Sequence, residues 1–340
     1  MLHVQRASGT WSDRNFRDFL QLLRPGDLLV FNNTKVYPAR LYGRRQGSRA
    51  QPVSRHNPAA RDFLHGQIEV LLTRQLSTDP NDWECLVRPG RKIGVGEHLL
   101  FGEQGESENE MRAEVLARGE FGERRIRFNP VPDFFAVLDR IGHVPLPPYI
   151  SRAEASEDRD RYQTVYAEPR GSAAAPTAGL HFTPELLRSI HDHGIETTQI
   201  TLHVGLGTFQ PIRVDRVEDH RIHTEHYTIS PEASFALNQA IRSSRRILAI
   251  GTTTVRALEH AIRLGSGSIN PGNATADLFI YPGFEFKAVG ALLTNFHLPQ
   301  SSLLMLVCAF GGKENVLRAY EHAVSARYRF YSYGDCMFME

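Results

Sequence analysis

The residues that could do chemistry begin in a segment that neither a helix nor a strand explains. From Tyr162 to Phe182 the chain reads YQTVYAEPRGSAAAPTAGLHF, and prolines and glycines interrupt it repeatedly. The segment carries a hydroxyl at Thr177 and an imidazole at His181 among small residues that let a ligand approach backbone N–H groups. A Gly/Pro-rich connector with a surface histidine is the alternative, but the three features together favour a site.

A helix is expected directly after this segment. Thr183 suits an N-cap, Pro184 suits the first helical position, and Gly194 can close the helix. A helix N-terminus favours anionic or polar ligand atoms. The loop with Thr177 and His181 leads directly into this N-terminus, so both side chains are expected close to a position that suits such a ligand. The start of the segment, Tyr162 to Ala167, could be a short strand.

A second loop with three hydroxyls follows a buried strand, Ile247 to Ile250. Gly251 is followed by Thr252, Thr253 and Thr254, and a helix ending near residue 265 comes next. Hydroxyls and free N–H groups at a strand-to-helix turn lie where α/β sheets bind polar ligands. N-capping alone explains one threonine but not three.

Two more segments near the C-terminus combine polar and aromatic groups. Asn295 and His297 place an amide and an imidazole at the end of a buried strand, Ala291 to Phe296. The run from Tyr328 to Asp335 interleaves aromatic residues with a base and an acid, which suits stacking on nucleobases. An aromatic clasp over the core is nearly as good an interpretation.

Two other patterns are weaker. Gly205 and Gly207 follow a strand, Glu196 to His203, but the third glycine of a dinucleotide-binding turn is missing. The turn still offers close backbone approach, a hydroxyl at Thr208 and an aromatic face at Phe209. The nearby cluster of three histidines and one glutamate suggests a metal, but no cysteine or second cluster completes a ligand set, so we expect no metal. That cluster is His220, His223, Glu225 and His226.

Composition indicates a soluble globular chain of two domains. The chain has 340 residues, 41% of them hydrophobic and 23% charged, without a sign of disorder. Its three cysteines form no CxxC pair, which suits a reducing cytoplasmic compartment. The N-terminus lacks the order of a signal peptide, and polar residues interrupt the most apolar region, Val289 to Phe310, so no membrane span is expected. A net charge of +1 neither requires nor excludes nucleic acid.

The order of elements predicts a discontinuous α/β domain with an inserted barrel. Between Gly66 and Phe128 five short strands with period two suggest a small antiparallel barrel, either a packed domain or an RNA platform using Arg88, Arg91 and Lys92. Strands and helices alternate on both sides of it. The prediction is an α/β domain, a mixed sheet with flanking helices, from residues 1–62 and 146–340, and an inserted antiparallel β-barrel domain from residues 63–145.

Several individual elements are also expected. They are a helix over residues 12–23, strands over Leu28–Phe31, Ala39–Tyr42 and Leu278–Tyr281, a solvated insertion from Gly43 to His65, an apolar core element over Leu303–Phe310 and a last helix over Glu314–Tyr328.

Nine strings, in order, carry a resemblance to a known family. They are LRPGDLLVFNNTKVYPARLYG, VPLPPYI, RYQTVYA, AAPTAGLHFTPELL, TLHVGLGTFQPIRV, GTTTVRALE, DLFIYPGFEF, LLTNFHLP and YRFYSYGD. Together they span nearly the whole chain, which resembles the S-adenosylmethionine:tRNA ribosyltransferase-isomerase family. The resemblance implies an α/β domain with an inserted β-barrel. It also implies a reaction that joins the ribosyl part of S-adenosylmethionine to 7-aminomethyl-7-deazaguanine at the tRNA wobble position, releases adenine and methionine, and gives epoxyqueuosine-tRNA.

The sequence departs from the family pattern in two places. The family usually begins with a segment leading into a strand like Ser-Arg-Leu-Leu-Val-Leu, whereas this chain opens at Met1 inside that strand, a difference that concerns the folding of the chain or its start site. The loop from about Gln46 to His65 is longer than the family's hairpin.

The chemistry of this reaction suggests roles for the candidate residues. The sulfonium acidifies the neighbouring C5′ hydrogens, so a base must remove one while an acid assists adenine departure. His181, His203 and His297 are the candidates for proton transfer. Asp277 and Asp335 are the candidates that orient the attacking amine or hold its ammonium form.

The remaining candidates would bind substrate. Thr252 to Thr254 and Arg256 would hold ribose or carboxylate groups, and Phe209 could face the sulfonium. A wobble base flipped out of its stack could lie on an aromatic residue of the C-terminal run. The full set of expected substrate-binding residues is Tyr162, Gln163, Thr164, Thr177, Gly179, Gly205, Gly207, Thr208, Phe209, Thr252, Thr253, Thr254, Arg256, Asn295, Arg327, Tyr328, Arg329, Phe330 and Tyr333.

Two other classes of protein stay open at this point. Another S-adenosylmethionine-dependent RNA-modifying enzyme, such as a methyltransferase, would use the same ligand, but an early strand with a glycine-rich nucleotide loop is absent. A non-catalytic tRNA-binding module would explain the barrel and the aromatic residues, but not the polar groups at so many strand ends.

Overall fold

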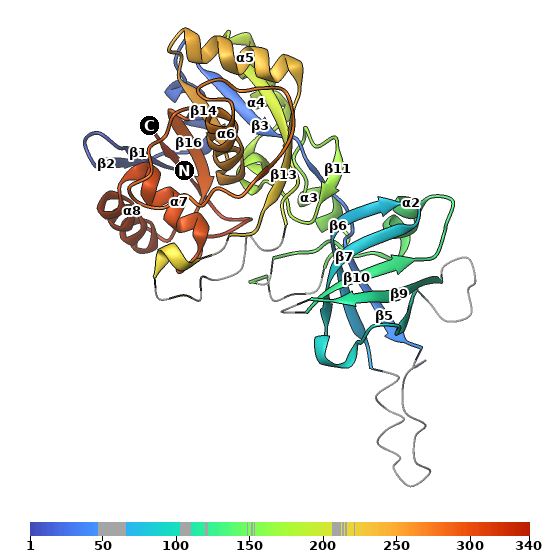
Figure 1. Cartoon of the computed structure of the whole chain (residues 1–340). Helices are drawn as coiled ribbons and strands as arrows, with labels where there is room; N and C mark the ends of the chain where they lie inside the picture. The colour runs from blue at the N-terminus through green and yellow to red at the C-terminus, as the bar shows by residue number, and fades with distance from the viewer. Residues whose placement is uncertain are drawn as a thin grey trace, which may run out of the picture. The chain divides into compact units, whose positions relative to one another are not determined.

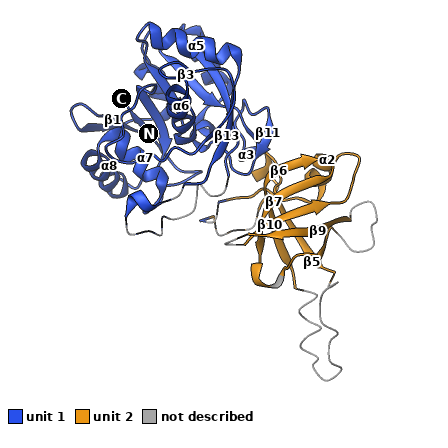
Figure 2. Ribbon diagram, in the orientation of Figure 1, with its two compact units in different colours: residues 1–35, 147–149, 160–340 blue, residues 36–146, 150–159 orange. Residues whose placement is uncertain are grey.

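The structure is a computed structural model that describes residues 1–46, 66–102, 110–119, 122–147, 149–150, 152, 154–205, 212, 214, 216–220 and 222–340. It divides into two compact units (Figure 2). The sheet unit comprises Met1–Lys35, Pro147–Tyr149 and Asp160–Glu340, and the barrel unit comprises Val36–Leu146 and Ile150–Arg159.

The sheet unit is built on a nine-stranded mixed sheet of order β15-β13-β12-β3-β14-β16-β17-β1-β2 (Figure 1). Its central strands β12, β3, β14 and β16 are parallel, and β17 runs antiparallel to β16. The strands are β1 (Leu2–Gln5), β2 (Thr10–Asp13), β3 (Leu28–Asn32), β12 (Glu196–Leu202), β13 (Glu225–Ile229), β14 (Ile247–Ile250), β15 (Gly272–Ala276), β16 (Ala291–Asn295) and β17 (Cys336–Met339).

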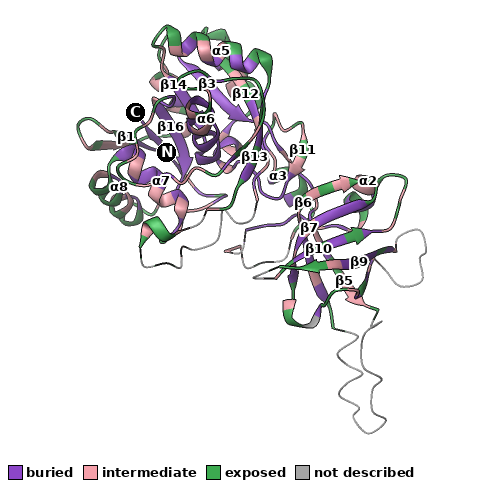
Figure 3. Cartoon of the chain, in the orientation of Figure 1, coloured by how far each residue is buried: buried purple, intermediate pink, exposed green. Residues whose placement is uncertain are grey.

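Both faces of this sheet are covered, because successive side chains of a strand point to opposite sides. Leu28 and Val30 of β3 belong to one apolar core, while Leu29 and Phe31 belong to the other. Figure 3 shows the central strands of this sheet as mostly buried. Helices α5 (Pro231–Arg242), α6 (Thr252–Leu264), α7 (Ser302–Gly311) and α8 (Lys313–Ser325) contribute to the first core, and η1 (Phe16–Leu22), η3 (Thr177–His181) and α4 (Pro184–Asp192) to the second.

The barrel unit contains a closed antiparallel barrel of order β10-β7-β6-β5-β8-β9. Its first strand, β5, lies before residue 63, so the strand expected at Ala39–Tyr42 belongs to the barrel and extends into the segment expected to be a solvated insertion. The strands are β5 (Arg40–Arg45), β6 (Ile68–Thr78), β7 (Asn81–Arg88), β8 (His98–Phe101), β9 (Met111–Arg118) and β10 (Glu123–Phe128).

The remaining elements are short. They are β4 (Lys35–Val36) and β11 (Arg170–Ser172), which pair with each other, and the helices η2 (Gly90–Lys92), α2 (Phe134–Ile141), α3 (Asp158–Arg161) and η5 (Val217–Asp219). Among the residues that the structure describes, no helix has the length and apolar character needed to cross a membrane.

The predicted fold class is confirmed: a mixed sheet with flanking helices carries an inserted antiparallel barrel. Several elements differ from the sequence expectation. The helix expected over residues 12–23 is a 3₁₀ helix over Phe16–Leu22, because Thr10–Asp13 pairs with β1 as a strand. Neither residues 162–167 nor residues 278–281 form a strand. The apolar element at residues 303–310 is helix α7.

A buried carboxylate fixes α6 to the segment that enters β16. Glu259 is fully buried, and its oxygens accept hydrogen bonds from the backbone N–H groups of Lys287, Ala288 and Val289 at 2.9 to 3.1 Å. Arg263, one turn further along the helix, donates to the same carboxylate at 2.6 Å. Four donors therefore depend on one side chain, and β16 in turn positions Asn295 at its end.

We expect Glu259→Ala to lower the free energy of unfolding by about 3 kcal/mol, because it leaves buried N–H groups and one guanidinium without their acceptor. Urea denaturation measures this loss. The matched control is Glu321→Ala, an exposed glutamate on α8, which should change stability by less than about 0.5 kcal/mol. Equal effects of the two substitutions would contradict the structural role of Glu259.

Candidate functional site

Polar groups from distant parts of the chain meet at one edge of the sheet. Because β12, β3, β14 and β16 are parallel, their carboxyl ends share this edge, which is the usual ligand position in open α/β sheets. Asn295 at the end of β16 is opposite Cys336 at the start of β17, so the loop that precedes β17 reaches the same edge.

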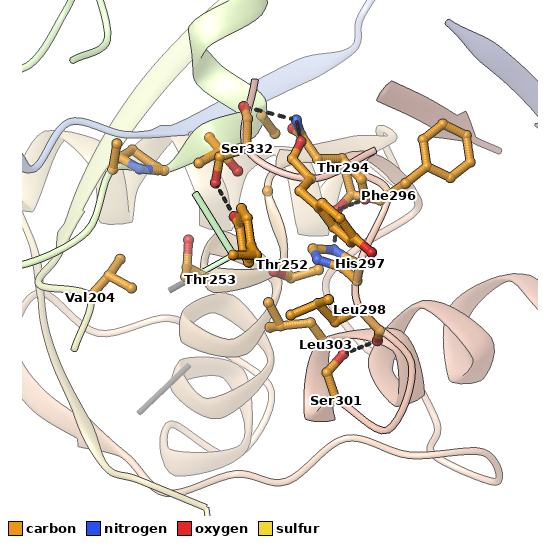
Figure 4. Close-up of a pocket in the computed structure, with 18 residues that line it drawn as sticks. Val204, Thr252, Thr253, Thr294, Phe296, His297, Leu298, Ser301, Leu303 and Ser332 are labelled. Atoms are coloured by element: carbon orange, nitrogen blue, oxygen red, sulfur yellow. Dashed lines mark hydrogen bonds between the residues drawn. The ribbon is translucent and has the colours of Figure 1, made fainter. Parts of the chain in front are cut away.

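A pocket with an empty volume of about 640 Å³, open solvent included, lies at this edge. Figure 4 shows side chains from the ends of β14 and β16, from η3 and from the C-terminal loop around it. The lining residues are Tyr149, Ala175, Pro176, Thr177, Ala178, Val204, Gly251, Thr252, Thr253, Thr294, Asn295, Phe296, His297, Leu298, Ser301, Leu303, Tyr331 and Ser332.

The three threonines after β14 do not share one environment. Thr252 and Thr253 line the pocket at the N-terminus of α6. Thr254 instead turns its hydroxyl to the carbonyl of Ile250 at 2.8 Å, away from the pocket. Gly251 has φ +93°, a left-handed conformation that glycine adopts without strain, and this lets the chain turn from strand into helix.

His297 is the histidine whose side chain lines the pocket. Its Nε2 lies 2.8 Å from the Thr294 hydroxyl, as Figure 4 marks, and its backbone N–H donates to the Tyr320 hydroxyl at 3.0 Å. Burial lowers the pKa of the imidazole to about 4. The ring is therefore neutral at pH 7 and can accept a proton, but it cannot supply one to a substrate at the start of a reaction.

His181 lies at the end of η3, with its ring centroid 5.1 Å from that of Phe16. Burial lowers its pKa to about 4, against a smaller opposite effect of the Asn295 amide. Despite this proximity, the buried His181 Nε2 and Asn295 Oδ1 make no hydrogen bond of good geometry. A polar ligand atom between or beside them would satisfy both.

Three more buried polar atoms without a partner lie on the preceding segment. They are the hydroxyls of Tyr162, Thr164 and Tyr166, and Gln163 lies half-buried among them. Burial raises the pKa of the Tyr162 and Tyr166 phenols well above the usual range, so both keep their proton. A Cβ on Gly179 would lie 2.0 Å from the Tyr166 hydroxyl, which explains why glycine stands there.

The C-terminal loop contributes an aromatic wall. Tyr331 lines the pocket with its ring 4.8 Å from that of Tyr149, and the hydroxyl of Tyr149 is hydrogen-bonded to Ser332. Tyr331 has φ +73°, an outlier for a bulky side chain of the kind that functional sites often hold. The side-chain N–H groups of Asn295 donate to the carbonyls of Tyr331 and Ser332 at 2.9 and 3.3 Å.

The other aromatic candidates of this loop differ in accessibility. The Phe330 ring stacks on Phe296 at 4.7 Å, and Tyr328 packs against the same ring and donates to Asp13 at 2.5 Å. Tyr333 is exposed, 6.0 Å from the Tyr162 ring. Arg327 and Arg329 are also exposed.

Two candidates are engaged in buried or half-buried contacts away from the pocket lining. The Nδ1 atom of His203 lies 2.8 Å from the Thr34 hydroxyl, and burial lowers the pKa of its ring. Arg256 is buried in an ion pair with Glu225 and donates to the carbonyl of His223 at 3.1 Å. Each of these contacts accounts for the polar group of its residue without a bound ligand.

The two candidate carboxylates are also outside the pocket lining. Asp277 is 76% exposed, with its Oδ1 atom 3.7 Å from Nε2 of His260. Asp335 accepts from the backbone N–H of Arg329 at 2.8 Å and lies close enough to His181 to raise that pKa slightly. Of the two, Asp335 is therefore nearer the polar groups of the pocket edge.

Some residues that line the pocket were not expected from the sequence, and some of the expected substrate-binding residues lie outside the described residues. Gly207, Thr208 and Phe209 are among the latter, and Gly205 is the last described residue before them. The lining residues with polar groups that were not among the candidates are Tyr149, Thr294, Ser301, Tyr331 and Ser332, although Tyr149, Thr294, Tyr331 and Ser332 lie in the strings VPLPPYI, LLTNFHLP and YRFYSYGD. Among the described residues, no three His, Cys, Asp or Glu side chains gather as a metal site.

Comparison with known proteins agrees with this architecture along the whole chain. Residues 1–339 match the family model described as queuosine biosynthesis protein. The chain is 52% identical to the S-adenosylmethionine:tRNA ribosyltransferase-isomerase of Solibacter usitatus, over 99% of this chain and 92% of that relative. It is 46% identical to the protein of the same name from Geobacter metallireducens, over 100% of this chain and 92% of that relative.

A solved structure is similar as well. The crystal structure of S-adenosylmethionine tRNA ribosyltransferase from Thermotoga maritima is 35% identical in sequence, with a TM-score of 0.50, and the match covers 100% of this chain and 91% of that one. Family model, relatives and structure thus agree from one end of the chain to the other. The chain belongs to the queuosine biosynthesis protein family.

Proposed function

We propose that the protein transfers the ribosyl part of S-adenosylmethionine to 7-aminomethyl-7-deazaguanine at the wobble position of tRNA and isomerises it. The products are epoxyqueuosine-tRNA, adenine and methionine, and S-adenosylmethionine serves as a co-substrate. The match of residues 1–339 to the queuosine biosynthesis family carries this proposal. The names of relatives that cover nearly the whole chain support it.

His297 is the proposed acceptor of the C5′ proton. It lines the pocket, whereas His203 does not, and burial keeps its ring neutral. The Thr294 hydroxyl fixes the orientation of the ring through Nε2, which leaves Nδ1 as the second nitrogen. Loss of the C5′ proton gives a carbanion that the adjacent sulfonium stabilises. Its electron pair forms a C4′–C5′ double bond as the C4′–O4′ bond breaks, O4′ becomes a carbonyl oxygen on C1′, and adenine leaves C1′ with the bonding pair and takes up a proton.

His181 and Asp335 are the proposed partners of the attacking amine. The amine must lose a proton to become nucleophilic, and the neutral His181 ring has an unpartnered nitrogen that can receive it. The Asp335 carboxylate acts on the same ring and would stabilise the cation formed there. The amine adds to C4′, the electron pair returns to C5′ and forms a bond to the C1′ carbonyl carbon, and the resulting alkoxide displaces the sulfur as the epoxide closes. Methionine is released and the amine remains bonded to the isomerised sugar.

The tRNA is proposed to reach the pocket at the aromatic wall. Tyr331 lines the pocket and Tyr333 is exposed beside it in sequence, so a base that leaves its stack can lie against one of these rings. Phe330 is the weaker candidate because its ring is already stacked on Phe296. A cytoplasmic location is part of the same proposal and fits three cysteines that are free and buried.

The two alternatives that the sequence left open are not favoured. A non-catalytic tRNA-binding module and another S-adenosylmethionine-dependent RNA-modifying enzyme would each require that the family match and the names of the relatives mislead along the whole chain. Free adenine distinguishes them, because methyl transfer yields S-adenosylhomocysteine and a binding module yields neither product.

We expect His297→Gln to slow adenine release at least about 100-fold, because the substitution removes the proton acceptor while keeping a polar side chain of similar size. Single-turnover adenine release from S-adenosylmethionine, with tRNA carrying the aminomethyl-deazaguanine base, measures this. His191→Gln, an exposed histidine on α4, is the matched control and should keep the wild-type rate. A wild-type rate in His297→Gln would exclude the proposed role.

The lowered pKa of His297 predicts a specific pH dependence of stability. The folded pKa of about 4 lies below the ordinary value of 6.5, so the unfolded chain binds the proton first and stability falls as pH drops through this window. At pH 5 this difference in proton binding at His297 lowers the free energy of unfolding by at most about 2 kcal/mol. We expect His297→Gln to lose less stability than wild type between pH 7.5 and pH 5 in urea titrations. Identical losses would mean that the imidazole is not held neutral by burial.

We expect Tyr333→Leu to raise the dissociation constant for tRNA about tenfold, since stacking of one base on an aromatic ring contributes about 1–3 kcal/mol. Fluorescence anisotropy with labelled tRNA measures this at fixed salt. Phe235→Leu removes an even more exposed aromatic ring from α5 and should leave the affinity unchanged. If both substitutions leave tRNA binding intact, Tyr333 does not stack on the base.

A further inference from the structure

The N-terminus of α6 has donors that no group of the protein accepts. No side chain caps this helix of 13 residues, and its N-cap residue Gly251 donates its own N–H to Leu293 at 2.8 Å. The first helical hydrogen bond runs from Val255 to Gly251. The three backbone N–H groups of residues 252–254 therefore lack an acceptor within the described part of the chain.

Two hydroxyls stand beside these N–H groups. Thr252 and Thr253 line the pocket and are only 5% and 7% exposed, and neither side chain has a hydrogen-bond partner among the described residues. The Thr254 hydroxyl differs, since the Ile250 carbonyl already accepts its proton. The pocket-facing start of α6 is thus rich in unused donors.

An independent feature of the same pocket also points to a ligand. Asn295 lines it, is 2% exposed, and has an amide oxygen without a partner. The side-chain nitrogen donates to two carbonyls of the C-terminal loop, those of Tyr331 and Ser332, so the orientation of the amide is fixed and the oxygen is the free atom. A buried acceptor without a hydrogen bond is unfavourable, so a ligand that donates to it is stabilised there.

We propose that the start of α6 binds the carboxylate of the methionyl part of S-adenosylmethionine. This inference rests on the proposed function. The carboxylate is the only anion of that substrate, and backbone N–H groups at a helix N-terminus favour an anion. The ammonium group on the same carbon atom then donates to Asn295 Oδ1, the unpartnered acceptor of the same pocket.

The chemistry of the donors selects the carboxylate over the ribose. A ribose hydroxyl both donates and accepts, whereas the three N–H groups can only donate. A carboxylate is acceptor-only and has about four lone-pair positions, so it matches a set of N–H donors supplemented by two rotatable hydroxyls. Binding there anchors the end of the substrate that leaves as methionine.

The test compares S-adenosylmethionine with decarboxylated S-adenosylmethionine, which keeps the sulfonium, the amine and the adenosine. Equilibrium dialysis of the full chain measures both dissociation constants in the presence of tRNA with an unmodified wobble guanine, which cannot react. We expect the decarboxylated compound to bind wild type roughly tenfold to hundredfold more weakly.

Two variants assign this difference to α6. Thr252→Val and Thr253→Val each remove a hydroxyl at nearly constant volume, and each should reduce the ratio of the two dissociation constants about threefold to tenfold. Thr254→Val is the matched control on the same helix turn, and the ratio should stay at the wild-type value because that hydroxyl faces Ile250.

The outcomes separate this inference from the proposed function. Equal affinities of wild type for the two compounds would overturn the carboxylate site and leave the reaction intact. Equal weakening of both compounds by Thr252→Val and Thr253→Val would show that the hydroxyls hold another part of the substrate, which also overturns it. If a folded sample binds neither compound, the proposed function itself fails.

Discussion

A buried polar group has to find a hydrogen-bond partner, and the sheet unit departs from this requirement mainly at one place. Seven buried side-chain atoms lack a partner among the described residues, and five of them belong to Tyr162, Thr164, Tyr166, His181 and Asn295. Glu259 is the opposite case, because its buried carboxylate accepts hydrogen bonds from four donors. Unsatisfied groups therefore indicate the candidate site more sharply than the shape of the pocket does.

These polar groups are uncharged, which bears on how a cationic substrate would be bound. Burial keeps the imidazoles of His181 and His297 neutral and keeps the phenols of Tyr162 and Tyr166 protonated. No carboxylate side chain is among the lining residues that the structure describes. A sulfonium bound there would face no carboxylate side chain of the described lining, and this favours loss of the neighbouring C5′ proton.

Sequence patterns indicated the parts of the candidate site that depend on local chemistry. Glycines and prolines in residues 162–182 indicated a loop without regular structure, and polar residues after β14 and β16 indicated a shared edge, because parallel strands end together. The pairing of β1, β2 and β17 was not predictable, since it joins the two ends of the chain and leaves no local signal. The barrel likewise takes a strand, β5, from before its expected start.

The sequence could not show which residues of one type line the pocket and which make contacts within the protein. Thr252 and Thr254 are two positions apart, yet one lines the pocket and the other bonds the carbonyl of Ile250, because a helix turns about 100° at each residue. The contact of Arg256 was unpredictable for a similar reason. Its partner Glu225 is 31 residues away and comes close only when β13 pairs into the sheet. Long-range pairing, which a single sequence does not show, decides these cases.

The unpartnered groups of the candidate site also lower the stability of the free protein. Each unsatisfied buried atom costs about 1–3 kcal/mol, and the left-handed backbone of Tyr331 adds strain of similar size. Neighbouring elements must hold these groups in place, which Glu259 does for β16 and Asn295 does for the C-terminal loop. A substrate that supplies the missing hydrogen bonds therefore stabilises the folded chain as it binds. Selectivity follows from the same cause, because a ligand without matching groups leaves those costs in place.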